Sequence, residues 1–193
     1  VTLRRRLRGG RFVRVYDLQT SQRSSAYFTL FAGGARPEWS GIARGASHRH
    51  VNPDRVRLHT IERQAEQLRV AGIDFVPRPD VSFLQSDIDR FALSRSFALL
   101  VPGGSAHRSA KRWPEVNYAE LADRLADAGI EPVLLGGAAE AAELDRIAMA
   151  AAASNHCGHT SIADIGSLAR RTRVTVGGHA GAMDLIGAAG CRP

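Results

Sequence analysis

Two hydrophobic patterns alternate along the second half of the chain. Short, continuously apolar runs predict buried strands at 97–101, 132–135 and 174–176. Apolar residues at helical spacing predict helices over 118–128, 138–153, 162–171 and 182–189. Strands that are apolar throughout and alternate with helices are typical of a parallel sheet covered on both faces. The pattern therefore predicts an α/β, doubly wound fold.

The first half of the chain has a weaker pattern. Apolar and polar residues alternate over 12–17, which predicts a strand, and an apolar stretch over 24–31 predicts a helix that ends before Gly33. Residues 41–52 are polar and without a period, which predicts a loop, whereas helical spacing over 53–71 predicts a helix that Gly72 ends.

A turn-rich break at 77–79 divides the chain. We interpret residues 1–78 as part of an N-terminal domain, 79–95 as an interdomain linker, and 96–193 as a truncated C-terminal domain. The chain begins without Met in a basic helical stretch and stops directly after a predicted helix, so we expect a fragment that lacks both termini.

Charge narrows the classes of partner. The 193 residues carry a net charge of +7, which fits nucleic acid, an anionic membrane face or a phosphorylated substrate. The arginines are spread along the chain with few aromatics between them, and no nucleic-acid-binding module is recognisable, so we expect no nucleic-acid partner. No apolar run reaches the roughly 20 residues needed to span a bilayer, which leaves a soluble or peripheral protein.

Metal-binding patterns are weak. Cys157 and Cys191 lack the spacing of a metal site or of a disulfide framework, which favours a reducing compartment. His48 and His50 form a His-x-His pair that could bind a metal. No Cys or carboxylate cluster lies near them in the sequence, so a solvated loop is the favoured interpretation. We expect no metal and no cofactor.

The single lysine of the chain is a candidate phosphate ligand. Lys111 follows the turn Gly103-Gly104-Ser105 and precedes a predicted helix near Pro114. In a chain that otherwise uses arginine, one ammonium group at this place favours a point charge for a phosphate, with the Ser105 hydroxyl as a second donor. The alternative is a surface lysine before a helix.

Glycine-bearing loops follow the strands that end at residues 101, 135 and 176. Each leads toward a helix N-terminus, where free N–H groups favour an anion. Because the carboxyl ends of parallel strands meet at one edge, the loops predict a shared nucleotide or sugar-phosphate crevice. Glu140, in the second loop, could accept two ribose hydroxyls, or could instead merely complement a helix dipole. No dinucleotide-binding or Walker glycine motif is present.

These motifs resemble a known family. Pro102-Gly103-Gly104-Ser105 with Lys111-Arg112-Trp113-Pro114, then Leu134-Leu135-Gly136-Gly137 with Glu140, Thr160-Ser161-Ile162 and Gly177 to Gly190 resemble, in order, the C-terminal domain of glycosyltransferase family 9, the ADP-heptose:lipopolysaccharide heptosyltransferases. Asp17-Leu18-Gln19 is similar to a segment late in that family's N-terminal domain. The resemblance covers nearly the whole chain.

The resemblance implies two Rossmann-like domains of the GT-B type, each incomplete here, with parallel sheets and helices on both faces. It implies inverting transfer of a heptose-like sugar from a nucleoside-diphosphate donor, ADP-heptose, to a lipopolysaccharide-core-type acceptor, in the cytoplasm or peripherally at the inner face of the inner membrane. Carried over by position, the site residues are Gly104, Ser105, Lys111 and Gly181 for the diphosphate, Glu140 and Thr160 for the nucleoside, and Arg23 for the acceptor.

The sequence departs from the family in two respects. The family has Asp-Ser/Thr-Gly-x-x-His after the last strand, whereas this chain has His179-Ala180-Gly181 and then Asp184. His179 and Asp184 are thus candidates for contact with the donor sugar or a phosphate, because an imidazole cannot accept two sugar hydroxyls as a carboxylate does. The second departure concerns catalysis: the expected general-base Asp would lie before Val1, so we expect the fragment itself to be inactive.

Two alternatives remain open at the level of sequence. The exchange at His179 and Asp184 is compatible with a non-catalytic or degenerate relative that binds a nucleotide or glycan without sugar transfer. Another GT-B sugar-nucleotide enzyme, such as an epimerase, would share the fold but release free sugar or an epimer.

Overall fold

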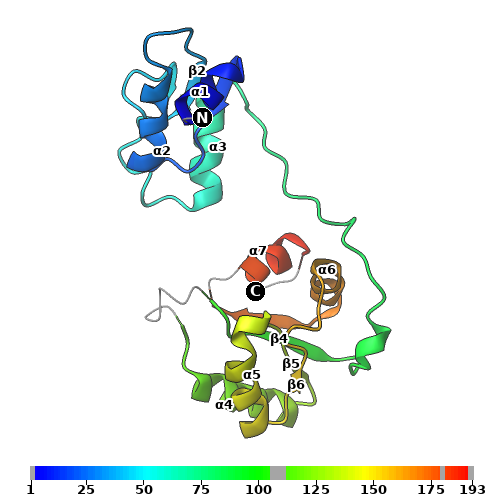
Figure 1. Ribbon diagram of the computed structural model, residues 1–193. Coiled ribbons are helices and arrows are strands. Elements are labelled where there is room, and N and C mark those ends of the chain that lie inside the picture. The colour runs from blue at the N-terminus through cyan, green and yellow to red at the C-terminus, as the bar shows by residue number, and fades with distance from the viewer. Residues whose placement is uncertain (1–2, 105–111, 179–180, 191–193) are drawn as a thin grey trace. The chain divides into compact units, whose positions relative to one another are not determined.

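The computed structural model describes residues 3–104, 112–178 and 181–190. The chain forms two compact units, residues 1–77 and residues 78–193 (Figure 1). Each unit contains its own parallel sheet. Both sheets are flanked by helices, in agreement with the predicted α/β class.

The second unit contains a four-stranded parallel sheet with the order β6-β5-β4-β7. Its strands are β4 (Phe97–Val101), β5 (Glu131–Leu134), β6 (Ser154–Asn155) and β7 (Val174–Gly177). The helices are α4 (Glu115–Asp127), α5 (Ala141–Ala150), α6 (Ile162–Arg171) and α7 (Gly181–Ala188), with short 3-10 turns η2 (Asp89–Phe91) and η4 (Ala138–Glu140). Helices α4 and α5 cover one face of the sheet, and α6 and α7 cover the other (Figure 1).

Successive side chains of β4 point to opposite faces of the sheet and so contribute to the two hydrophobic cores of this unit. Phe97, Leu99 and Val101 point toward α6 and α7, where they pack with Leu168 and Ile186. Leu100 points to the other face, into the core formed with α4 and α5. Each fully buried side chain of this size stabilises the fold by roughly 1.5–3 kcal/mol. Both faces are therefore closed, and only the ends of the strands are left to form a site.

The first unit contains a three-stranded parallel sheet with the order β1-β2-β3. Its elements are α1 (Leu3–Gly9), β1 (Arg14–Tyr16), α2 (Gln22–Ala26), the 3-10 helix η1 (Tyr27–Phe31), β2 (Glu38–Gly41), β3 (His48–Arg49) and α3 (Thr60–Val70). Phe28, Phe31 and Trp39 form its aromatic core, with the Phe28 and Trp39 ring centroids 5.4 Å apart.

The sequence-based expectations for 41–52 and 53–71 are partly wrong. Residues 48–49 form β3 rather than loop, and the helix predicted from residue 53 begins at Thr60. His59 precedes that helix and accepts a hydrogen bond from Ile61 N–H at 3.4 Å, which supplies a start signal that helical spacing alone does not reveal.

The His-x-His pair is not solvated as predicted. His50 is buried, with Nε2 3.3 Å from Glu66 Oε2, and His48 lies 3.6 Å from Glu38. Among the residues that the structure describes, no group of three or more metal-ligating side chains comes together. No helix within the same residues is long and apolar enough to cross a bilayer.

Part of the predicted interdomain linker is hydrogen-bonded to α6 of the second unit. Ser86 N–H donates to Ser167 Oγ at 2.9 Å, and the Ser86 hydroxyl donates to Asp164 Oδ1 at 2.6 Å. Arg90 pairs with Asp164 Oδ2 at 2.5 Å. A Cβ atom on Gly166 would lie 2.9 Å from the Leu84 carbonyl oxygen, so glycine permits this close approach. The part of the predicted linker from residue 84 onward thus packs as part of the second unit.

Candidate functional site

The strand order of the second sheet changes direction between β4 and β7. The chain leaves β4 toward α4 on one face and leaves β7 toward α7 on the other (Figure 1). In doubly wound sheets a ligand crevice opens where successive connections diverge in this way, outside the carboxyl ends of the strands. Gly103 and Gly104 follow β4, and Gly178 follows β7, so this edge is lined by glycine backbone.

The backbones of the two loops approach closely. Gly178 N–H donates to the Val101 carbonyl at 3.2 Å, and a Cβ atom on Gly178 would lie 3.3 Å from the Gly103 carbonyl oxygen. A Cβ atom on Gly177 would meet Val101 and Met183 at less than 3.0 Å. A side chain at Gly177 or Gly178 would therefore force the neighbouring atoms to shift.

Glu140 joins this edge from the loop after β5. Its Oε2 accepts a hydrogen bond from Gly137 N–H at 2.8 Å, which caps the turn η4. A Cβ atom on Gly103 would overlap the Glu140 carboxylate, and one on Gly136 would lie 3.0 Å from Oε2. Within the described residues Oε1 accepts no hydrogen bond. The carboxylate is therefore held against the loop after β4, and one of its oxygens can still accept a hydrogen bond.

The loop after β6 lies beside Glu140. Gly158 N–H donates to the Gly136 carbonyl at 2.9 Å, and Cys157 Sγ lies 3.1 Å from the Gly137 carbonyl. Burial raises the pKa of the Cys157 thiol, and the charges of Glu140 and Asp145 raise it further. Cys157 packs against the core formed with α4 and α5.

Three side chains that sequence reasoning missed support the same edge. Arg112 donates to the Gly104 carbonyl at 2.6 Å and pairs with Glu143 at 3.1 Å. Burial raises the pKa of the Tyr118 hydroxyl, the nearby Glu143 carboxylate raises it further, and a hydrogen bond from the Gly178 amide acts against both. Arg112 lies inside the Lys-Arg-Trp-Pro motif, but nothing local in the sequence connects it to Glu143, 31 residues later.

Comparison with known proteins identifies the family. The sequence profile of glycosyltransferase family 9 (heptosyltransferase) matches residues 1–190. The chain belongs to glycosyltransferase family 9. A comparison with curated protein sequences gave no match.

Solved structures of other glycosyltransferases share the fold. ADP-heptose LPS heptosyltransferase II of E. coli is 27% identical, with a TM-score of 0.62, over 98% of this chain and 63% of that one. A family 9 glycosyl transferase of Veillonella parvula is 16% identical, with a TM-score of 0.68, over 98% of this chain and 58% of that one. The E. coli heptosyltransferase WaaC with ADP-2-deoxy-2-fluoro heptose is 21% identical, with a TM-score of 0.63, over 97% and 63%. This family 9 chain thus spans less than two thirds of their length.

The structure places the predicted donor-site residues of this family member as follows. Gly104 and Glu140 lie at the edge just described, and Gly181 begins α7 with open space where a Cβ would stand. Asp184 is exposed in the first turn of α7, and Thr160 is half-buried just before the Ser161 cap of α6. Ser105, Lys111 and His179 lie outside the described residues.

The first unit of the family 9 chain has its own pocket. Arg23, the predicted acceptor residue, is exposed on α2. A pocket of about 340 Å³ opens between α2, η1 and the residues that follow β2. It is lined by Gln22, Ser25, Ala26, Phe28, Thr29, Ile42, Ala43 and Arg44. Sequence reasoning missed Arg44, which brings a positive charge to this pocket, because strand β2 before it was not predicted.

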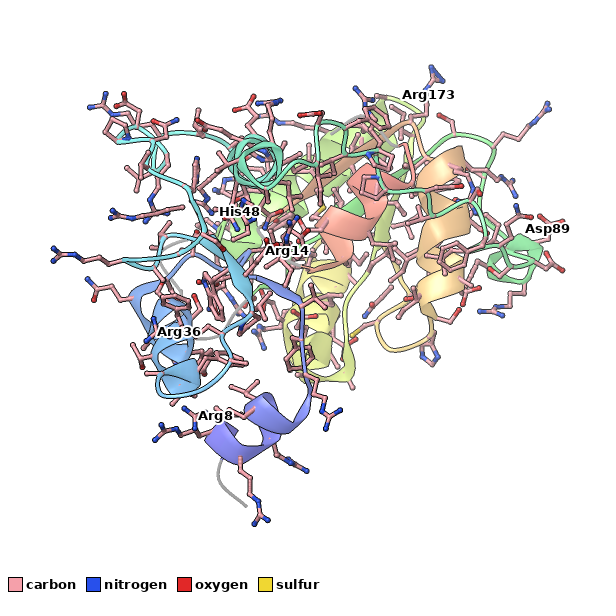
Figure 2. The ribbon with its side chains drawn as sticks, turned by 90° about the horizontal axis from the view of Figure 1, so that it is seen from above. Arg8, Arg14, Arg36, His48, Asp89 and Arg173 are labelled. Carbon is pink, nitrogen blue, oxygen red and sulfur yellow. The ribbon has the colours of Figure 1, made fainter. Side chains whose placement is uncertain are left out.

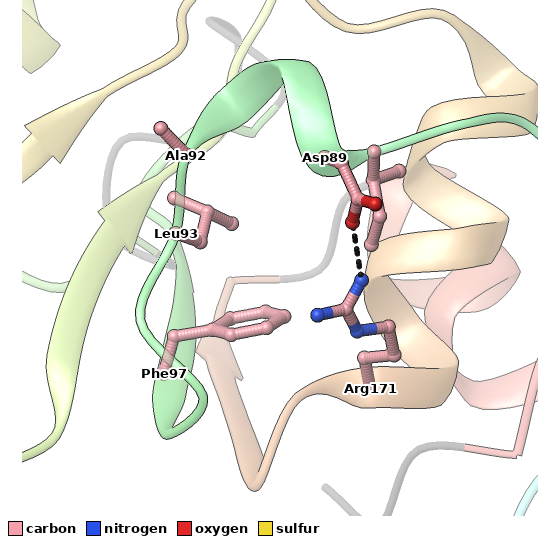
Figure 3. A pocket seen from close by; sticks show the side chains of 6 residues that line it. Asp89, Ala92, Leu93, Phe97 and Arg171 are labelled. Carbon is pink, nitrogen blue, oxygen red and sulfur yellow. Dashed lines mark hydrogen bonds and ion pairs between the residues drawn. The ribbon is translucent and has the colours of Figure 1, made fainter.

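A second pocket, of about 210 Å³, lies at the opposite end of β4 (Figure 3). Phe97, the first residue of β4, lines it together with Leu93, and Asp89 pairs with Arg171 across it at 3.2 Å. This pocket lies between the segment before β4 and α6, so it is separate from the glycine-lined edge.

Proposed function

We propose that the protein to which this chain belongs transfers a heptose-like sugar from a nucleoside-diphosphate donor, ADP-heptose, to a lipopolysaccharide-core-type acceptor, with inversion at the sugar. Membership of family 9 and likeness to an E. coli ADP-heptose LPS heptosyltransferase support the activity. The observation that carries the donor site is the approach of Gly103, Glu140 and Gly178 at one edge of the second sheet.

In this proposal residues 96–193 bind the donor. Gly104, Ser105, Lys111 and Gly181 contact the diphosphate, since backbone amides, a hydroxyl and an ammonium all donate to phosphate oxygens. The ADP-2-deoxy-2-fluoro heptose bound to the related E. coli enzyme supports a nucleotide-sugar donor.

In this proposal the nucleoside and the donor sugar lie on either side of the diphosphate. Glu140 accepts the ribose hydroxyls at the crevice, and the backbone near Thr160 contacts the base. His179 and Asp184 face the donor sugar or a phosphate.

The same donors assist the chemistry. An acceptor hydroxyl gives up its proton to a general-base carboxylate and attacks the anomeric carbon, the bond from that carbon to the diphosphate oxygen breaks, and negative charge develops on the departing diphosphate. Lys111 and the amides near Gly104 stabilise that charge, which lowers the barrier without a metal.

Residues 1–78 contribute the acceptor side. Arg23 and the pocket beside α2 support binding of an acidic sugar, because a guanidinium pairs well with a carboxylate and Arg44 adds a second positive charge.

Peripheral contact with the cytoplasmic face of the membrane completes the proposal. The described surface of α1 carries the exposed arginines Arg4, Arg5 and Arg6 beside the half-exposed Leu3. Figure 2 shows α1 with Arg8, which donates to the Leu30 carbonyl of the same unit at 3.1 Å. Basic surface of this kind is attracted to anionic lipids, at about 1 kcal/mol per arginine.

Calorimetry of the 193-residue chain with ADP tests the donor site. The proposal expects binding that weakens at least tenfold in Lys111→Ala, because the ammonium contacts the diphosphate. Arg173→Ala is the matched control, since Arg173 is exposed and directly precedes β7, at the opposite end of that strand from the proposed site. An ADP affinity equal in the unmodified chain and in Lys111→Ala would remove Lys111 from the site.

A further inference from the structure

We propose that Arg90 and Phe91 are positioning residues for the base of the donor nucleotide. Both lie in the turn η2, before β4, and they act on the two ends of the β6–α6 loop (residues 156–161). This assignment rests on the proposed function, in which the backbone near Thr160, inside this loop, contacts the base. Arg90 and Phe91 hold the loop and are not themselves assigned a contact with the ligand.

The β6–α6 loop lies at the carboxyl ends of the strands. His156 N–H donates to the Leu134 carbonyl at 3.0 Å, and Gly158 N–H donates to the Gly136 carbonyl at 2.9 Å. The first half of the loop is thus bonded to the end of β5 and to the segment that leads to Glu140. Among the described residues Thr160 makes no hydrogen bond, so its backbone amide and carbonyl can pair with the polar edge of a base.

Phe91 holds the first residue of the loop. Its ring meets the imidazole of His156 edge to face, with the ring centroids 4.9 Å apart and the planes at 69°. Phe91 also packs against the core that the sheet forms with α6 and α7. Aromatic pairs in this arrangement contribute about 0.5–1.5 kcal/mol beyond the burial of their area. The ring of Phe91 therefore connects His156 to the core of the unit.

Arg90 acts on the last residue of the loop through Asp164. Asp164 Oδ2 accepts hydrogen bonds from Ser161 N–H and from the Ser161 hydroxyl, both at 2.7 Å, and pairs with Arg90 at 2.5 Å. The Asp164 side chain is only 1% exposed, so its charge needs these partners. Arg90 Cζ lies 4.6 Å from the centre of the Phe91 ring, which joins the two contacts into one unit.

A loop held at both ends presents Thr160 in fewer conformations. If either contact is removed, the loop must be ordered at each binding event, and this cost falls on ligands that the loop contacts. ADP and UDP share the ribose and the diphosphate and differ only in the base. Loss of Arg90 or Phe91 should therefore weaken the binding of ADP more than that of UDP, whereas a general loss of structure would weaken both equally.

Calorimetric titration with ADP and UDP tests the assignment. Both nucleotides are titrated into the unmodified chain and into Arg90→Ala, Phe91→Leu and Arg171→Ala. Arg171 is the matched control, because it pairs with Asp89 of the same turn at 3.2 Å but lies at the other end of α6 from the loop (Figure 3).

We expect the unmodified chain to bind ADP about tenfold more tightly than UDP. In Arg90→Ala and in Phe91→Leu the ADP affinity should fall about tenfold, while the UDP affinity changes by less than about twofold. Arg171→Ala should match the unmodified chain with both nucleotides. Hydrogen exchange of the ligand-free chain over residues 156–161 gives a second readout, with faster exchange expected in Arg90→Ala and Phe91→Leu and not in Arg171→Ala.

Equal losses of ADP and UDP affinity would reduce Arg90 and Phe91 to a general structural role and overturn the inference. An unchanged ADP affinity in either variant would also overturn it, as would an unmodified chain that binds ADP and UDP equally well. If Arg90→Ala does not fold, Phe91→Leu, which keeps an apolar side chain in the core, decides the outcome. If the unmodified chain binds neither nucleotide, the proposed function fails as well; if it prefers ADP and the variants keep that preference, only this inference fails.

Discussion

The carboxylate of Glu140 lies directly against the backbone of Gly103, although the two residues follow different strands. The contact is possible because Gly103 has no side chain. We predict that Gly103→Ala displaces the carboxylate and disrupts its bond with Gly137 N–H, with a loss of about 1 kcal/mol in the free energy of unfolding. ADP affinity should fall as well. Urea denaturation and calorimetry measure the two effects.

A double-mutant cycle isolates this contact. In a Glu140→Ala background the added methyl group meets no carboxylate, so Gly103→Ala should then cost much less stability. Gly104→Ala is the matched control for stability, since a Cβ there has nothing within 4 Å. Equal costs of Gly103→Ala in both backgrounds would contradict the contact.

Asp164 should make stability depend on acid pH. Burial acts to raise the pKa of this carboxyl, but hydrogen bonds from Ser86 and Ser161 and the charge of Arg90 outweigh it and hold the pKa at about 2, against an ordinary value of 3.8. The folded state therefore binds the proton less tightly than the unfolded state. The resulting stabilisation, about 2 kcal/mol, is complete above pH 5 and is lost as the pH falls through 4 toward 2.

Urea denaturation between pH 2 and pH 6 tests this prediction. Asp164→Asn should be less stable than the unmodified chain at pH 6, and the difference should shrink as the pH falls. Asp89→Asn serves as the control, because Asp89 pairs with Arg171 on exposed surface. A difference between Asp164→Asn and the unmodified chain that is the same at every pH would show that the carboxylate charge is not responsible.

The arginines of α1 should govern vesicle binding. We predict that the chain sediments with vesicles that contain phosphatidylglycerol, and that replacing Arg4, Arg5 and Arg6 by Gln reduces this partitioning by roughly a hundredfold. Arg57, Arg69 and Arg173 are also exposed, so their replacement by Gln gives a control of equal net charge. Equal losses in the two triple variants would assign the attraction to net charge rather than to α1.

The second unit was predictable because its strands are buried on both faces. Continuous apolar runs identify β4, β5 and β7, and parallel topology then brings their following loops to one edge. Strand β6 was not predicted, because it consists of the half-buried polar residues Ser154 and Asn155 at the edge of the sheet. The strands that could be predicted from sequence are therefore the longer ones whose residues are buried.

The first unit was harder to predict because some of its buried residues are polar and are held by contacts with residues far away in the sequence. In β2 the buried positions include Ser40 and Gly41, which read as polar and turn-forming in sequence. The amide of Gln67 on α3 donates to the Ser40 carbonyl at 3.2 Å and to the Asp17 carbonyl at 3.1 Å, so a side chain far away in the sequence supplies the donor for both carbonyls. No window of sequence contains both partners of these bonds.

In the candidate site, too, local features were predictable from sequence and contacts between distant residues were not. Glycines after strands and the acidic Glu140 were found from local sequence and topology. The Arg112–Glu143 pair was not found, since arginine is abundant throughout the chain and the partner lies 31 residues away.

Hydrogen exchange with and without ADP tests the central claim, that a nucleoside diphosphate binds at the carboxyl ends of β4, β5 and β7. The account predicts slower exchange with ADP in the peptides that contain residues 102–104, 136–140 and 177–178, and no change around the pocket lined by Asp89 and Phe97. Protection confined to residues 1–77, or to the Asp89 end of the sheet, would contradict it.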